Sequence, residues 1–190
     1  MCVTIIALMQ LSLNASIFLI IYLGINIIYT LVGKHIPVLD IVCLGAGYPL
    51  RLLFGGVICN IQVSSWLFLT IVCLSLFMGI GKRRGEYVDN SAMNTRPVLD
   101  HYTLTWLNGQ LYFMLGLGIV FYSLWAIEKS IELVYTVPHV LIISMYYSLL
   151  IVKETDGDPI NTIFNNKLLL LLLIGYIASL TYLLYFFIKL

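Results

Sequence analysis

Four ionisable residues gather where a long apolar stretch ends. Lys82, Arg83, Arg84 and Glu86 directly follow residues 64–81, eighteen residues that carry no charge. Ammonium and guanidinium groups bind phosphate oxygens, and a neighbouring carboxylate can orient one of them or a hydroxyl. If the helix continues past the membrane boundary, Lys82 and Glu86 share one face and Arg83 points aside. The group is therefore a candidate phosphate site, although the same pattern is common in simple membrane anchors.

A second candidate lies inside the apolar segment 34–57. Asp40 and Arg51 are eleven residues apart, and Gly47 lies on the same stripe of a helix. The helical rise separates Asp40 from Arg51 by about 16 Å along the axis, too far for a direct ion pair. An arginine near the middle of a bilayer costs roughly 2.5 to 3.5 kcal/mol and normally faces a protein interior or a wet cavity. We expect Arg51 to line a polar cavity that opens to the basic face; bonding to the carbonyl groups of a neighbouring helix is the alternative.

The composition indicates a membrane protein. Of the 190 residues, 61% are hydrophobic and 10% are charged, and the mean hydropathy is +1.01. A soluble domain of this size leaves much of its surface in water and could not hide so much apolar surface. The net charge of +1 gives no reason to expect a nucleic-acid partner, because the field around the protein is weak.

The apolar runs predict an all-α fold, a polytopic transmembrane bundle that forms a single domain over residues 1–190. Runs of roughly 17 to 22 apolar residues can cross the hydrocarbon core as helices, which satisfy their own backbone groups there. The opening run, 1–13, is too short for a full span and has the character of a partial helix. About six full helices are predicted, near residues 15–32, 38–59, 63–81, 106–127, 135–152 and 167–189.

The basic residues predict the orientation of this bundle. If six helices alternate in direction, the basic residues divide unequally between the two faces, and the richer face is expected to be cytoplasmic in a plasma membrane. Lys129 and Lys189 fall on the poorer face. The richer face holds Lys34, Lys82, Arg83, Arg84, Arg96, Lys153 and Lys167.

Four blocks in one order carry a resemblance to a known family. They read KHIPVLDIVCLGAGYPLR, SLFMGIGKRRGE, RPVLDHYTLTWLN and GDPINTIFNNKLLLL. Together they resemble the later part, roughly the C-terminal two thirds, of the UbiA prenyltransferase superfamily. Within it they are most similar to the decaprenyl-phosphate phosphoribosyltransferase branch. Each block by itself is weak, but their combined order is specific and covers nearly the whole chain.

The resemblance implies a helical bundle around a cavity open to the cytoplasmic side. It also implies a reaction in which a polyprenyl phosphate attacks C1 of phosphoribosyl pyrophosphate and releases diphosphate. Mg²⁺ is the implied cofactor, because a hard cation with oxygen ligands neutralises the leaving diphosphate.

The family-like positions assign six substrate-binding residues. They are Lys34, Asp40, Arg51, Lys82, Arg83 and Glu86. No metal ligand and no catalytic residue is assigned. Asp158 precedes Pro159 and is better explained as a helix cap than as a ligand.

The departures from the family pattern leave the function open. The family's first aspartate motif, N-D-x-x-D-x-x-x-D, which supplies principal Mg²⁺ ligands, has no counterpart in the sequence and is expected upstream of Met1. Pro49 and Tyr146 also differ from the family pattern. Three hypotheses remain: a transferase fragment completed by a separate N-terminal piece, a non-catalytic polyprenyl-phosphate-binding or membrane-assembly protein, and an unrelated transporter or channel subunit. A homo-oligomer is the alternative to the N-terminal piece as a protein partner.

Overall fold

The computed structural model describes residues 13–88, 97–153 and 159–187, and within these ranges every regular element is a helix. Three short 3₁₀ segments, η1 to η3, connect longer helices. In chain order the elements are α2 (Leu13–Leu31), η1 (Gly33–His35), α3 (Leu39–Cys59), α4 (Ser65–Val88), η2 (Pro97–His101), α5 (Leu104–Lys129), η3 (Ile131–Thr136), α6 (Val137–Lys153), α7 (Pro159–Asn165) and α8 (Lys167–Phe187).

The six predicted helices are confirmed, with one informative difference in length. α4 continues to Val88, well beyond the predicted end at residue 81, so the basic cluster is helical. Five apolar segments are long enough to cross a membrane: 39–59, 65–88, 104–129, 131–151 and 167–186. α2 contributes the shorter apolar stretch Ile17–Leu31. The chain is therefore an integral membrane protein. The partial helix predicted at residues 1–13 and the cap predicted at Asp158 lie outside the described residues, except for Leu13.

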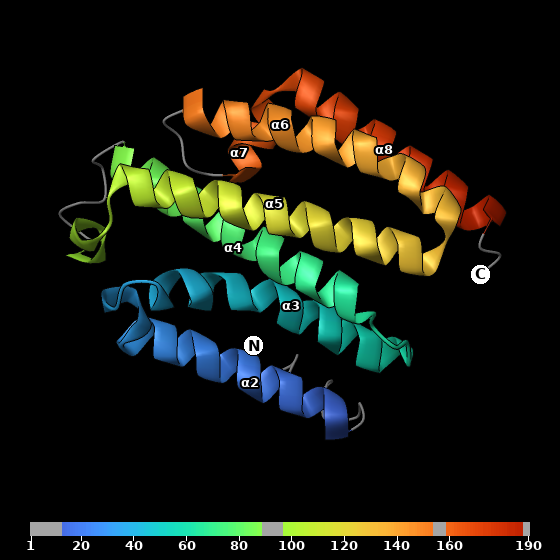
Figure 1. Ribbon diagram of the computed structural model, residues 1–190. Helices are drawn as coiled ribbons and strands as arrows, with labels where there is room; N and C mark the ends of the chain where they lie inside the picture. Colours follow the sequence, from blue (N-terminus) through green and yellow to red (C-terminus); the bar gives the residue numbers. More distant parts are fainter. Residues whose placement is uncertain (1–12, 89–96, 154–158, 188–190) are drawn as a thin grey trace.

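The long helices form three layers that run roughly along one direction (Figure 1). α2 packs on α3, α4 packs on α5, and α6 packs on α8, with α4 also contacting α3. Glycine allows α3 and α4 to approach closely. A Cβ added at Gly79 would lie 3.3 Å from Cγ2 of Ile41, and one added at Gly45 would lie 3.3 Å from Oγ of Ser75. The close approach brings Asp40, the neighbour of Ile41, onto α4.

The connections that the sequence assigned to the basic face lie at one end of the bundle. In Figure 1, η1, the end of α4, η2 and the end of α6 all lie at the left, whereas the α3–α4 connection and η3 lie at the right. The buried core is centred on α4 and α5 and includes Leu99 and Leu107, which are fully buried. The charged residues at the end of α4 therefore emerge beside a packed core.

Candidate functional site

Arg83 is the centre of a buried ion cluster at the basic end. Its side chain is 1% exposed, and its three guanidinium nitrogens donate to three different residues. Nε donates to Oδ2 of Asp40 at 2.5 Å, and Nη1 donates to Glu86, one helical turn along α4. Nη2 donates to the Tyr29 hydroxyl of α2 at 3.3 Å. One arginine thus ties α2, α3 and α4 together.

Asp40 is completely buried, and both of its carboxylate oxygens accept hydrogen bonds. Oδ1 accepts from the Tyr102 hydroxyl at 2.5 Å, while Oδ2 accepts from Arg83. The Tyr102 hydroxyl in turn accepts the backbone N–H of Val38 at 2.7 Å. Burial and the hydrogen bond to Asp40 raise the pKa of Tyr102 above its usual value, so its hydroxyl stays protonated at physiological pH.

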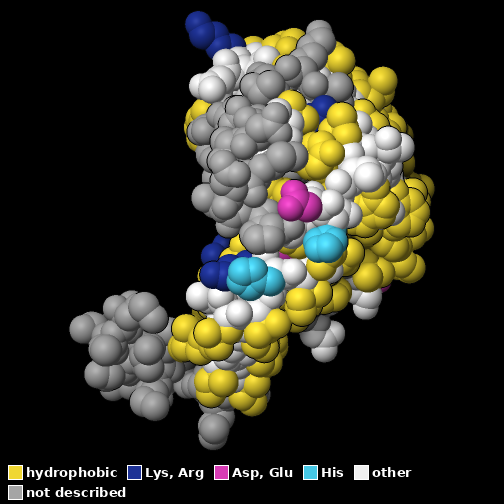
Figure 2. All heavy atoms as spheres, turned by 90° about the vertical axis from the view of Figure 1, so that its left-hand side faces the viewer, with side chains coloured by type: hydrophobic (Ala, Val, Ile, Leu, Met, Phe, Trp, Pro, Cys, Tyr) yellow, Lys and Arg dark blue, Asp and Glu magenta, His cyan; other side chains and the backbone are white. Residues whose placement is uncertain are grey.

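α4 continues past this cluster, which keeps Lys82 and Glu86 on one helix face, but Arg83 does not point aside as predicted. Glu86 pairs with Arg83, three residues away, and Lys82 is exposed. Lys34 of η1 is also exposed. Seen from that end, the surface shows basic, acidic and histidine side chains close together (Figure 2). Exposed ammonium groups and a buried guanidinium thus share one end of the molecule, and only the former are open to a ligand.

Arg84 has a role that sequence reasoning missed. Its side chain is 5% exposed, its Nε donates to Oδ1 of Asn108 at 2.7 Å, and its Nη1 donates to the carbonyl oxygen of Ile151 at 2.6 Å. These bonds join α4 to α5 and to the last turn of α6. A cation that satisfies carbonyls at a helix C-terminus stabilises that end. Arg84 is therefore a structural residue and not part of an exposed anchor.

Arg51 lies in a different environment, at a polar cavity between α2 and α3. The cavity has a volume of about 220 Å³. Nη2 of Arg51 donates to the Tyr22 hydroxyl at 3.1 Å, and the guanidinium lies 5.6 Å and 5.7 Å from the ring centres of Tyr22 and Tyr48. The lining residues are Tyr22, Ile25, Asn26, Tyr29, Cys43, Leu44, Gly47, Tyr48 and Arg51.

Asp40, Gly47 and Arg51, which were expected to share one helix stripe, lie in two different environments. Arg51 lines a cavity, as predicted, and Gly47 lies beside it in the cavity wall, whereas Asp40 is buried against α4 and pairs with Arg83. Tyr29 connects the two sites, because it lines the cavity and accepts the hydrogen bond from Arg83. The cavity can accommodate an anion, since it offers a guanidinium together with hydroxyl and amide groups.

The described residues do not fit the Mg²⁺ that the resemblance implied. Across residues 13–88, 97–153 and 159–187, no group of three or more His, Cys, Asp or Glu side chains could hold a metal ion. Asp40 and Glu86, the two acidic candidates, are both engaged by Arg83. A buried carboxylate whose oxygens already accept hydrogen bonds is a poor ligand for a hard cation.

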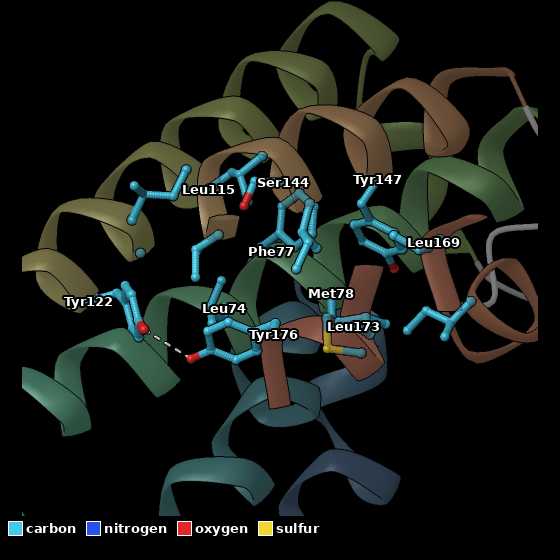
Figure 3. A pocket seen from close by; sticks show the side chains of 15 residues that line it. Leu74, Phe77, Met78, Leu115, Tyr122, Ser144, Tyr147, Leu169, Leu173 and Tyr176 are labelled. Carbon is cyan, nitrogen blue, oxygen red and sulfur yellow. Dashed lines mark hydrogen bonds between the residues drawn. The ribbon is translucent and has the colours of Figure 1, made fainter. Parts of the chain in front are cut away.

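A second, larger cavity was not predicted by the sequence. It has a volume of about 290 Å³ and lies between the α4–α5 layer and the α6–α8 layer, with mostly apolar walls (Figure 3). Tyr176 donates to the Tyr122 hydroxyl across one side of it at 3.1 Å. Tyr146, one of the departures from the family pattern, donates to Oδ1 of Asn166 at 3.2 Å and so supports the start of α8.

Comparison with known proteins agrees with the sequence resemblance. The chain is 28% identical over 177 residues to the decaprenyl-phosphate phosphoribosyltransferase of Mycobacterium tuberculosis. This alignment covers 90% of this chain and 58% of that protein. The Mycolicibacterium smegmatis protein of the same name is 31% identical over 122 residues, 63% of this chain and 38% of that protein. The Corynebacterium glutamicum protein is 32% identical over 112 residues, 58% of this chain and 34% of that protein.

The alignments thus span less than two thirds of the length of these relatives. No family model matches the chain. The order of the four sequence blocks, the all-helical membrane bundle and these identities agree with one another. The chain is a distant homologue of the decaprenyl-phosphate phosphoribosyltransferases, a branch of the UbiA family.

Proposed function

We propose that this chain is a UbiA-family membrane transferase whose α2–α3 cavity binds the phosphate of a phosphorylated substrate. The proposed reaction transfers phosphoribose from phosphoribosyl pyrophosphate to a polyprenyl phosphate. A phosphate oxygen of the lipid forms a bond to C1 of the ribose, and the bond from C1 to diphosphate breaks. The homology to proteins of that name supports the reaction class, and the cavity supports the place of binding.

The observation that carries the proposal is the environment of Arg51. Its hydrogen-bond partner in the described part of the chain is the neutral Tyr22 hydroxyl, and the described ion pairs involve Arg83 instead. An arginine within a membrane span calls for an anionic partner or a wet cavity. A phosphate in the α2–α3 cavity would supply the missing negative charge.

The other predicted substrate residues divide into two groups under this proposal. Lys34 and Lys82 are exposed at the basic end and would attract or contact the phosphate groups of the substrates. Asp40, Arg83 and Glu86 hold the neighbouring helices in place and reach the cavity through Tyr29. We also propose that the basic end faces the cytoplasm, because basic connections favour that side.

One observation favours a second candidate function, the binding of polyprenyl phosphate without catalysis. The described residues offer no cluster of potential metal ligands, and transfer from a diphosphate normally relies on a divalent cation. On this alternative the chain retains the lipid-phosphate site and has no transferase activity of its own.

Binding of a short polyprenyl phosphate tests the site. Farnesyl phosphate should bind the detergent-purified protein, and farnesol, which lacks the charge, should bind much more weakly. Arg51→Ala should weaken farnesyl phosphate binding about tenfold or more, because a hydrogen bond to a charged group is worth about 1.5 to 3 kcal/mol. The melting temperature of the Arg51→Ala variant should change little. Lys129→Ala, an exposed basic residue at the opposite end, is the control.

A transfer assay separates the two functions. The purified protein is incubated with radiolabelled phosphoribosyl pyrophosphate and decaprenyl phosphate, with and without Mg²⁺, and the label in the lipid fraction is measured. Label in the lipid supports the transferase. Binding of farnesyl phosphate without transfer under either condition supports the binding protein, and equal affinity for farnesyl phosphate and farnesol contradicts both.

A further inference from the structure

The chain enters α3 through a strained turn at residues 37–39. Val38 has φ 68° and ψ −43°, a left-handed conformation that a β-branched residue rarely adopts. The backbone N–H of Leu39 donates to the carbonyl oxygen of Pro37 at 2.8 Å, which closes a three-residue γ-turn. This form of the γ-turn is rare and strained, so the surrounding structure must hold it.

Side-chain packing does not hold this turn. The Val38 side chain is 48% exposed. The backbone N–H of Val38 instead donates to the Tyr102 hydroxyl at 2.7 Å, across 64 residues of sequence. Tyr102 is 5% exposed, and its ring stacks on Trp106 with a centroid distance of 5.3 Å. A rigidly packed ring therefore presents one hydroxyl to the strained turn.

The same hydroxyl reaches the first turn of α3. It donates to Oδ1 of Asp40 at 2.5 Å, and the other carboxylate oxygen of Asp40 accepts from Arg83. One oxygen atom thus joins the strained backbone of Val38 to the ion cluster. Because Arg83 also bonds to Tyr29 in the cavity wall, a continuous chain of hydrogen bonds connects Asp40 to the α2–α3 cavity.

We infer that Tyr102 is a positioning residue, whose hydroxyl holds the strained turn at Val38 and thereby fixes Asp40 and Arg83 beside the α2–α3 cavity. The inference rests on the proposed function for its effect on ligand binding, but the linkage itself does not depend on any ligand. The raised pKa of Tyr102 is consistent with the role, because only the protonated hydroxyl can donate to Asp40.

Two substitutions separate positioning from packing. Tyr102→Phe keeps the ring against Trp106 and removes the hydroxyl from the turn and from Asp40. Val38→Gly relieves the left-handed strain, because glycine adopts positive φ readily, and it deletes only an exposed side chain. Tyr135→Phe is the matched control, since Tyr135 is 80% exposed and belongs to η3, which lies at the other end of the bundle.

The first measurement is hydrogen exchange of the ligand-free protein, read by mass spectrometry on a peptide that contains residues 36–42. Tyr102→Phe should accelerate exchange of the Val38 amide about tenfold, because that N–H loses its acceptor. Exchange within α5 should not change. Unchanged exchange at residues 36–42 would overturn the inference whether or not the protein binds a phosphate.

The second measurement is the affinity for farnesyl phosphate. Tyr102→Phe should weaken binding about twofold to threefold, and adding Val38→Gly should recover part of that loss. If Tyr102 had only a structural role, Tyr102→Phe would lower the melting temperature, and adding Val38→Gly would not restore the affinity. If the wild type binds and Tyr102→Phe binds equally well, the positioning role is wrong. If the wild type does not bind, the proposed function fails, and the exchange result decides the linkage by itself.

Discussion

Arg83 and Arg51 occupy neighbouring parts of the bundle but different chemical surroundings. Arg83 is 1% exposed and donates to two carboxylates and a hydroxyl within the protein. Arg51 is exposed at a cavity and donates to one neutral hydroxyl. Their charges are the same, yet the protein itself neutralises the first and leaves the second without a described counter-ion.

This contrast separates the predicted binding residues that are open to a ligand from those that are not. A buried and paired cation would have to give up its partners before it could bind phosphate, so its removal should affect folding first. An open cation with a neutral partner can bind an anion at little cost in stability. The six predicted binding residues therefore divide into a group paired within the protein and a group of exposed cations that are open to a ligand.

The largest expected effect is the loss of stability in Asp40→Ala. The substitution leaves the buried Arg83 without one of its two carboxylates, and breaking a buried ion pair costs about 3 to 5 kcal/mol. We expect the lower end of that range, because Glu86 remains. Thermal unfolding in detergent, followed by tryptophan fluorescence, provides the measurement. Wild-type melting combined with lost phosphate binding would show that the Asp40–Arg83 pair contacts the ligand and does not act as scaffold.

A smaller loss is expected for Arg84→Ala. Asn108 and the carbonyl group of Ile151 lose a charged donor in the core, which should reduce the free energy of unfolding by about 2 kcal/mol. Lys82→Ala, two residues earlier on the same helix but exposed, is the control and should melt like the wild type. If both variants lose equal stability, the charged end of α4 acts as a diffuse surface and not through these specific contacts.

The smallest effect is expected for Tyr29→Phe, which cuts the link between the two arginine sites. The variant keeps the ring and loses the 3.3 Å hydrogen bond from Arg83 together with one hydroxyl of the cavity wall. Farnesyl phosphate binding should weaken about threefold, which corresponds to less than about 1 kcal/mol. Isothermal titration calorimetry, with Tyr135→Phe as the reference, would measure this change in affinity. An unchanged affinity would mean that the Arg83 cluster and the α2–α3 cavity are independent.

The helices were predictable because each apolar run is long and is separated from the next by charged, polar or turn-forming residues. The end of α4 was less so, since the uncharged run stops at Gly81 whereas the helix continues to Val88. Beyond Gly81 the helix is stabilised by contacts with α3, α5 and α6 that involve Arg83 and Arg84. A hydropathy pattern contains no information about such distant partners.

The pairing of the charged residues at the basic end was not predictable from the sequence. Helix geometry allowed Glu86 to pair with Lys82 or with Arg83, and spacing by itself did not decide. Asp40 decided it, because α3 brings a carboxylate from 43 positions away against the same face of α4. Gly79 offered one usable signal, since a helical glycine between apolar residues often marks a close helix contact.

The apolar cavity between the α4–α5 layer and the α6–α8 layer has a mechanical consequence. Closely packed protein interiors resist compression, whereas a seam with free volume yields more easily. η3 joins the two layers at one end of the bundle, and α7 bridges them near the other. We therefore expect a change in the lateral pressure of the surrounding bilayer to alter the spacing of this seam more readily than the charged cluster at the end of α4.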